Sequence, residues 1–273
     1  PTPTPRAVNA DPDAMQSAYE TLKTLEEAVV PINDPVDLAL RLKGIKDVPS
    51  VVEKPLPQLN EVHEFWATNI DTNEQFKVKA KLAYITPHSY FWIEEGTRYN
   101  ARDLKALADT FEEEIYPTNQ EFFGSEWTPG IDNDEHLYLL YASNLGGSVA
   151  GYFSSVDSLP AVVHPYSNEH EMFVFNTDTV GLNEEYTYGV LAHEFQHMIH
   201  WYHDRNEESW LNEGFAELAV FLNGYGTGFK DHNFLSDPAD VQLNDWPTDF
   251  DLTLPHYGAS FMFVTYFLDR FGE

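Results

Sequence analysis

Residues 187–219 read TYGVLAHEFQHMIHWYHDRNEESWLNEGFAELA, and the rest of the chain is interpreted around them. His193 and His197 are four residues apart, and on a helix such residues lie one above the other on the same face. Their imidazoles could bind one metal ion, and Glu194 beside them could take a proton from a water on that metal. Apolar residues recur at helical spacing around the motif, which predicts a buried helix: Val190, Leu191, Phe195, Met198 and Ile199.

A third metal ligand is expected further along the chain, because a catalytic zinc usually has three protein ligands and an open fourth position. Glu213, in the sequence WLNEGFAE, is the candidate. The polar run 203–208 predicts a turn, after which a second helix, about 208–222, would fold back antiparallel. Glu217 lies one turn beyond Glu213 and could accept a hydrogen bond from a ligating histidine.

HEFQH followed by WLNEGFAE resembles the gluzincin zinc peptidases, the clan of thermolysin and the membrane aminopeptidases. Within that clan, LAHEFQHMI with WLNEGFAELA most resembles the hyicolysin-like bacterial peptidases. The resemblance implies zinc ligation by His193, His197 and Glu213, with Glu194 as general base and Glu217 as the acid that supports a ligating histidine. Only 15 residues separate His197 from Glu213, fewer than in thermolysin or the aminopeptidases, so the connection must be tighter.

A metzincin-type site is the alternative interpretation of the same stretch, with His203 as the third ligand. HEFQHMIHWYH nearly matches HExxHxxGxxH, but His200 replaces the glycine at which the helix must turn. No convincing methionine turn follows. His200 and His203 are therefore expected near the helix end, supporting a ligand or facing substrate.

The composition limits the class of protein. Forty-five acidic residues against 15 basic ones give a formal charge of −30, which argues against nucleic acid and anionic membrane surfaces as partners. The 273 residues include no cysteine, so disulfides and thiolate metal sites are excluded. No run of 18 apolar residues predicts a membrane span.

The first residues, PTPTPR, read as a stiff linker, and the expectation is a secreted or cell-surface protein whose signal segment is not in this chain. Asp11 and Asp34, each followed by proline, are expected to cap two helices. Residues 1–60 are assigned to this N-terminal helical segment, which could be propeptide-like, and residues 61–273 to a catalytic domain with a sheet lobe (61–183) and a zinc-helix region (184–273).

The expected fold class is α+β, a mainly antiparallel sheet leading into a helical zinc region, with a thermolysin-like core implied by the resemblance. Period-two alternation predicts antiparallel strands between residues 61 and 93, and HLYLLYA at 136–142 predicts a buried strand. Residues 100–123 have helical period. The run Asp132–Asn133–Asp134–Glu135 is a candidate Ca²⁺ site, although it lacks the full calcium-loop pattern. The glycine-rich stretch 146–152 suggests a mobile loop beside the active site.

Residues 171–176 are expected to form the last strand before the zinc helix. In gluzincins a strand at this position is the sheet edge that pairs with extended substrate. Aminopeptidases of the clan add a glutamate nearby to hold the free amine, and Glu169 or Glu171 falls there, with Glu171 retained as a substrate-facing candidate. The surrounding motif differs from theirs, which favours internal cleavage of proteins.

Residues 223–250 read as loop, and Pro255 is expected to open an apolar helix. This segment resembles the one in aminopeptidases where a tyrosine stabilises the oxyanion. That match implies Tyr257 as the oxyanion donor, with His256 second. The function favoured is a zinc-dependent endopeptidase for extracellular proteins; a non-catalytic binding module on an inactive peptidase fold and a hydrolase of some non-peptide amide remain the alternatives.

Overall fold

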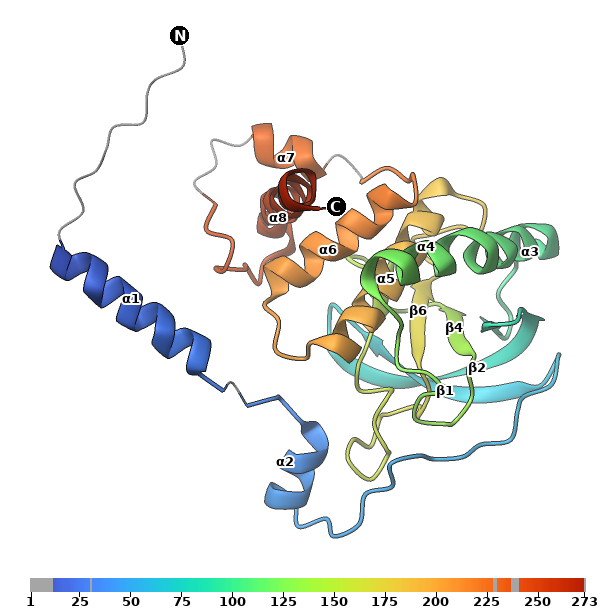
Figure 1. The fold of residues 1–273 in the computed structure, drawn as a ribbon. Coiled ribbons are helices and arrows are strands. Elements are labelled where there is room, and N and C mark those ends of the chain that lie inside the picture. Colours follow the sequence, from blue (N-terminus) through green and yellow to red (C-terminus); the bar gives the residue numbers. More distant parts are fainter. Residues whose placement is uncertain (1–11, 30, 228–229, 237–240, 273) are drawn as a thin grey trace. The chain divides into compact units, whose positions relative to one another are not determined.

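The computed structural model describes residues 12–29, 31–227, 230–236 and 241–272 (Figure 1). The chain divides into two compact units, Pro1–Asn33 and Asp34–Glu273. The first unit contains α1 (Pro12–Glu27). The predicted linker at the start of the chain and the predicted Asp11 cap lie outside the described residues.

The second unit contains a sheet and most of the helices. Its helical elements are α2 (Pro35–Leu42), α3 (Ala101–Thr110), the π-helix η1 (Phe111–Ile115), α4 (Tyr116–Phe123), α5 (Glu185–His203), α6 (Ser209–Leu222), α7 (Lys230–Ser236) and α8 (Phe250–Phe271). Its strands are β1 (Val62–Asn69), β2 (Glu74–Ile85), β3 (Ser89–Glu94), β4 (Leu137–Ala142), β5 (Gly151–Phe153) and β6 (Met172–Asn176).

The strands form one six-stranded sheet in the order β1-β2-β3-β4-β6-β5. The pairs β1/β2, β2/β3 and β5/β6 are antiparallel, whereas β3/β4 and β4/β6 are parallel. The predicted α+β class is confirmed, with antiparallel pairing at both ends of the sheet and parallel pairing in its centre. Every residue of β4 and β6 is buried, which is typical of central parallel strands covered on both faces.

One face of the sheet is covered by α3, η1, α4 and α5 (Figure 1). Side chains at alternate positions of β4 point to this face and pack against the helices: Leu137, Leu139 and Tyr141. The fully buried Phe195 of α5 contacts Phe111 and Tyr116, with ring centroids 5.5 and 5.1 Å away. This core supports the helix that bears the HEFQH motif.

The other face is covered by the sheet itself. Its core consists mainly of strand side chains, including Phe65 from β1, Trp92 from β3 and Tyr138 from β4. The Phe65 ring lies 5.0 Å from that of Trp92 and 6.3 Å from that of Tyr138. The sheet therefore curls so that β1 and β2 close over the central strands, as its right-handed twist allows.

The segment from α2 to β1 belongs to the second unit and packs against the rest of it. Asp34 caps α2 as predicted, since its carboxylate accepts from the N–H groups of Val36 and Asp37. Ala39 is buried in a small cluster with Leu159 and Val163. The division into compact units falls between residues 33 and 34, and the predicted assignment of residues 1–60 to an N-terminal segment stays a prediction. The catalytic-domain role given to residues 61–273 stays a prediction.

Three expectations about elements need correction. The edge of the sheet near α5 is β5, and β6 lies inside the sheet, because the three-residue strand β5 pairs outside it. The last helix begins at Phe250 and contains Pro255, which sits in its second turn. The predicted loop after α6 includes the short helix α7. Within the described part of the chain, no helix has the length and hydropathy needed to cross a bilayer.

Candidate metal centre

Two antiparallel helices carry the candidate ligands, as the sequence predicts. The first, α5, ends at His203, and Asp204 begins a short polar turn in which its carboxylate accepts from the N–H of Asn206. The chain then reverses into α6, which begins at Ser209. Because the connection is only a few residues long, α6 packs directly along α5, and its Glu213 faces the histidines of α5.

Three ligand-type atoms converge between these helices. The Nε2 atoms of His193 and His197 are 3.0 Å apart. Oε2 of Glu213 lies 3.3 Å from Nε2 of His193 and 3.6 Å from Nε2 of His197. Among the described residues, these three form the one group of metal-ligand side chains whose donor atoms lie within 4.8 Å of one another.

The triangle fits a zinc ion. Tetrahedral zinc with bonds of about 2.0–2.1 Å separates its ligand atoms by about 3.3 Å, close to the three distances found. Oε2 of Glu213 is buried and faces Nε2 of both imidazoles. Two imidazoles with one carboxylate form a donor set that suits zinc best.

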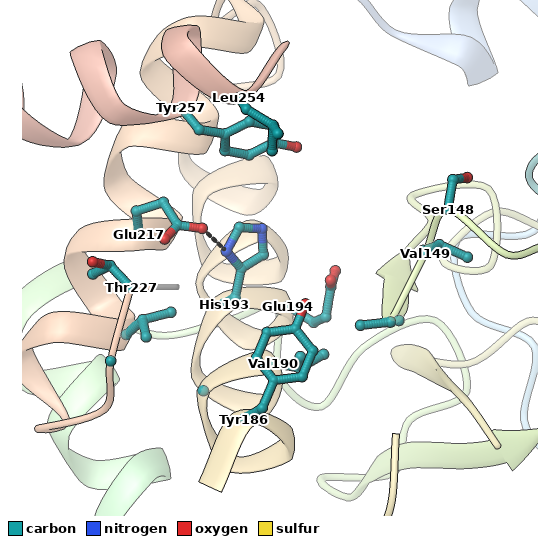
Figure 2. A pocket seen from close by; sticks show the side chains of 15 residues that line it. Ser148, Val149, Tyr186, Val190, His193, Glu194, Glu217, Thr227, Leu254 and Tyr257 are labelled. Atoms are coloured by element: carbon teal, nitrogen blue, oxygen red, sulfur yellow. Dashed lines mark ion pairs between the residues drawn. The ribbon is translucent and has the colours of Figure 1, made fainter. Parts of the chain in front are cut away.

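Glu217 sets the orientation of the first histidine. Its Oε1 lies 3.1 Å from Nδ1 of His193, and its side chain is almost fully buried on α6 (Figure 2). A hydrogen bond from Nδ1–H to this carboxylate leaves Nε2 free to bind a metal. Burial lowers the pKa of His193, but hydrogen bonds to Glu213 and Glu217 outweigh burial and raise that pKa to about 10. The site thus concentrates negative charge around the imidazoles.

Glu194 lies beside the triangle in a pocket of about 300 Å³. Figure 2 shows His193, Glu194, Glu217 and Tyr257 gathered around this pocket. The Glu194 side chain is largely buried, and its Oε2 accepts a 2.7 Å hydrogen bond from the backbone N–H of Phe153 in β5. The carboxylate is therefore held next to the metal ligands and the edge strand at once.

The pocket walls come from several parts of the chain. The stretch Ser148–Gly151 leads into β5 on one side, and α8 contributes Leu254 and Tyr257 on another. Apolar side chains of α5 and α6, Val190 and Val220, complete much of the lining. An extended peptide could enter between the edge strand and these helices, since β5 has no strand on its outer side among the described residues.

Tyr257 lies where its hydroxyl can serve as a donor. Burial raises the pKa of Tyr257, and the nearby carboxylates, Glu213 foremost, raise it further. The phenol therefore keeps its proton. Its hydroxyl is within hydrogen-bond reach of Glu213, which brings it to the edge of the ligand triangle.

Two histidines of α5 lie outside the triangle. Nε2 of His203 is 2.9 Å from the backbone oxygen of Ser125, so its N–H donates to that carbonyl. The metzincin interpretation requires His203 to lie beside His193 and His197. In the structure Glu213 occupies that position, and His203 contacts Ser125 instead. His200 packs edge-on against Phe215, and burial lowers its pKa. Neither histidine lines the pocket.

Two other candidates are placed away from the pocket lining. Glu171 is buried, and its carboxylate accepts from the N–H of Ile131 at 3.1 Å. It packs so closely over Gly130 that a Cβ at that position would meet its carboxylate oxygen at 1.7 Å, so a larger residue there would have to displace this carboxylate. Nδ1 of His256 contacts the backbone oxygen of Leu252 at 3.1 Å. Neither residue lines the pocket, and the expectation that Glu171 and His256 face substrate stays a prediction.

Nothing supports the predicted calcium site. Asp132 contacts Nδ1 of His170 at 2.5 Å, and Asp134 contacts Nδ1 of His136 at 2.6 Å. Each carboxylate thus has an imidazole partner. The residues of 132–135 form no group of converging metal ligands in the described structure.

The backbone N–H of Phe153 is the site group that sequence reasoning missed. Every residue except proline carries such a donor, so no residue type signals it. The strand that presents it is three residues long, too short for a period-two pattern to be recognised. Only the position of β5 against α5 reveals the contact.

The fold and the two-histidine, one-glutamate cluster define an α+β protein with a zinc-type site of the kind found in metal-dependent hydrolases. No family model matches the chain. Over 198 residues, it is 27% identical to the protein named neutral metalloprotease ShpI from Staphylococcus hyicus. The alignment covers 68% of this chain and 43% of that protein, so the chain spans less than half the length of this curated relative. A metalloprotease is thus a distant relative of this chain.

Proposed function

We propose that this chain is the catalytic part of a zinc-dependent endopeptidase. The observation that carries the proposal is the convergence of Nε2 of His193, Nε2 of His197 and Oε2 of Glu213 at the edge of a pocket that His193 and Glu194 line. The similarity to a metalloprotease supports the same reaction class. A structural histidine cluster would have no use for a buried carboxylate aimed into the cavity.

His193, His197 and Glu213 would hold the zinc, with Glu217 orienting His193. When bound, zinc supplies a Lewis acid that polarises the scissile carbonyl and acidifies water. Glu194 takes the proton from the attacking water and later delivers it to the leaving amine. The N–H of Phe153 fixes the Glu194 carboxylate during both transfers. Tyr257 donates its hydroxyl hydrogen to the oxygen on which negative charge develops.

Internal cleavage is proposed over removal of N-terminal residues. Glu169 and Glu171 are the candidates for binding the free amine of a substrate, and neither lines the pocket. The pocket therefore lacks these two candidates for the amine-binding group that an aminopeptidase uses. The substrates proposed are extracellular proteins. Recovery of the native protein only from the cell interior would rule that location out.

The test is to measure bound metal and peptide hydrolysis for the wild type, Glu194→Gln and Glu213→Ala. Wild type is expected to hold about one zinc per chain and to cleave a protein substrate into internal fragments. Glu194→Gln should retain zinc and lose about 10²–10⁴-fold in turnover, since only the proton acceptor is removed. Glu213→Ala should lose most of its zinc.

Full hydrolysis by Glu194→Gln would end the proposed mechanism. Zinc retained by Glu213→Ala but lost by His203→Ala would move the third ligand to His203. A wild type that takes up no zinc when supplied with it would favour a non-catalytic binding module, and cleavage of small amides alone would favour a non-peptide hydrolase.

A further inference from the structure

The outer edge of β1 is closed by hydrogen bonds from a distant part of the chain. Three alternate backbone N–H groups, those of Trp66, Thr68 and Ile70, point away from β2. They donate respectively to Oδ1 of Asn168 at 2.7 Å, the hydroxyl of Tyr152 at 2.9 Å and the carbonyl of Leu145 at 2.8 Å. These acceptors lie within residues 145–168, so the curl of the sheet brings the strand at one edge, β1, against the segment that carries the strand at the other, β5.

The turn between β1 and β2 makes further contacts with the same distant segment, residues 145–168. The carboxylate of Asp71 accepts from the N–H of Gly147 at 2.7 Å and from the hydroxyl of Ser148. These two donors, the Ser148 hydroxyl first, hold the pKa of Asp71 below its usual value. Gly146 has φ +107°, and a Cβ there would come within 2.8 Å of the Asp71 carboxyl carbon. The glycine loop is therefore shaped to receive this side chain.

The tied segment is a wall of the candidate active site. Residues 148–151 line the pocket, and β5 follows without a break. Tyr152 points into the core on the β1 side, whereas the N–H of the next residue, Phe153, donates to Glu194. Tyr152, the middle residue of β5, thus binds the edge of β1, and the backbone N–H of the next residue binds the proposed general base.

We propose that Asp71 and Tyr152 are positioning residues, which tie the glycine loop and β5 to β1 and thereby align the substrate wall and Glu194. The inference rests on the proposed peptidase function. Neither side chain lines the pocket, so both act through the backbone of residues 147–153. The glycine-rich loop, expected to be mobile, is contacted by these groups and by Asn176, whose amide donates to the carbonyls of Gly146 and Val149.

The two residues should affect different kinetic constants. Asp71 supports the loop that contacts substrate, so Asp71→Ala should mainly raise KM. Tyr152 adjoins the amide that holds Glu194, so Tyr152→Phe should mainly lower kcat while its ring stays in the core. Since small misplacements in an active site are costly, about a 10-fold loss in kcat/KM is expected for each. Asp71→Asn keeps an acceptor for the Gly147 N–H and should recover most of the loss.

The experiment compares zinc-loaded wild type, Asp71→Ala, Asp71→Asn, Tyr152→Phe and the control Glu64→Ala. Glu64 lies on β1 and pairs with Lys77 at the surface. Its removal therefore deletes a carboxylate from the same hairpin and leaves the contacts with residues 145–168 in place. Measurements are kcat and KM on one peptide, bound zinc, and amide hydrogen exchange in residues 144–153. The expected result is unchanged bound zinc in all proteins and faster amide exchange in this segment for Asp71→Ala. KM should rise in Asp71→Ala, and kcat should fall in Tyr152→Phe.

Kinetic constants and exchange in Asp71→Ala and Tyr152→Phe that match Glu64→Ala would overturn the inference. A loss of kcat/KM in proportion to a loss of bound zinc would also overturn it. Failure of the proposed function has a different signature, because the wild type itself would then cleave no peptide, with or without bound zinc.

Discussion

At the scale of single residues, the state of His193 depends on Glu217. An imidazole can present Nε2 to a metal only if its proton sits on Nδ1, and the carboxylate 3.1 Å from Nδ1 favours that tautomer. Glu217 is almost fully buried, so water cannot easily replace it. The proposed role of this acid is therefore to raise metal affinity without touching the metal.

Removal of this acceptor should weaken zinc binding. Glu217→Ala is expected to lower zinc affinity by about 10–100-fold, measured by competition with a chelator of known affinity. Glu217→Gln is the matched control, because its amide oxygen can still accept from Nδ1–H and should retain most of the affinity. Equal affinities for Glu217→Ala and wild type would assign the orientation of His193 to another group.

Tyr257 allows a test confined to one hydroxyl. Tyr257→Phe should lower kcat by about 10²–10³-fold with unchanged zinc content, because a donor to the developing oxyanion is lost. His256→Ala serves as the control, since His256 is adjacent in sequence but does not line the pocket. Unchanged turnover in Tyr257→Phe, or an equal loss in His256→Ala, would remove Tyr257 from the proposed mechanism.

At the scale of secondary structure elements, Asn119 joins three helices. Its side chain on α4 is fully buried and donates to the carbonyl of Ala192, the residue before the first proposed zinc ligand on α5. Its oxygen accepts from the side chain of Asn223, at the end of α6. One amide thus links the two ligand-bearing helices to the helix that covers the sheet.

This link should contribute measurably to stability. Asn119→Ala breaks both hydrogen bonds and leaves buried polar groups without partners, so the free energy of unfolding should fall by about 1–3 kcal/mol. Urea unfolding of the metal-free protein measures it. Glu121→Ala, an exposed position on the same helix, should have little effect. If the two substitutions cost the same, Asn119 does not hold the helices together.

At the scale of the whole molecule, buried acids outside the pocket make stability depend on pH. Burial, followed by the charge of Asp132, raises the pKa of Glu171 to about 8. Burial also raises the pKa of Asp157 to about 7. Both groups hold protons in the folded chain that they release when unfolded near neutral pH. The folded state therefore binds more protons, and its stability from these groups falls as pH rises.

The pH window follows from these values. For Glu171, the contribution is complete below about pH 4.5 and declines until about pH 8, where the folded group also ionises. Glu171→Gln removes the ionisation, so its stability relative to wild type should increase between pH 5 and pH 9 in metal-free urea titrations. A difference between the two proteins that is constant over this range would contradict the raised pKa. Glu64→Gln, at an exposed position, should show no such trend.

The sequence by itself determined the local part of the site. The four-residue spacing of His193 and His197 places them on one helical face through backbone geometry alone. The polar run after His203 predicted the reversal that brings Glu213 to them, and the continuous apolar run of β4 predicted its burial. These features depend on residues near one another in the chain, so pattern and period are enough to find them. The roles of the residues stay proposals.

Only the tertiary structure decided which strand forms the edge, where Glu171 lies, and how β1 closes on the glycine loop. The strand β5 is too short to show a period, and its key donor is a backbone N–H that any residue except proline could supply. The contacts of Asp71 with Gly147 and of Thr68 with Tyr152 join residues more than 70 positions apart. Such contacts arise from the curl of the whole sheet, because side-chain type and local spacing carry no information about which distant backbone groups will meet.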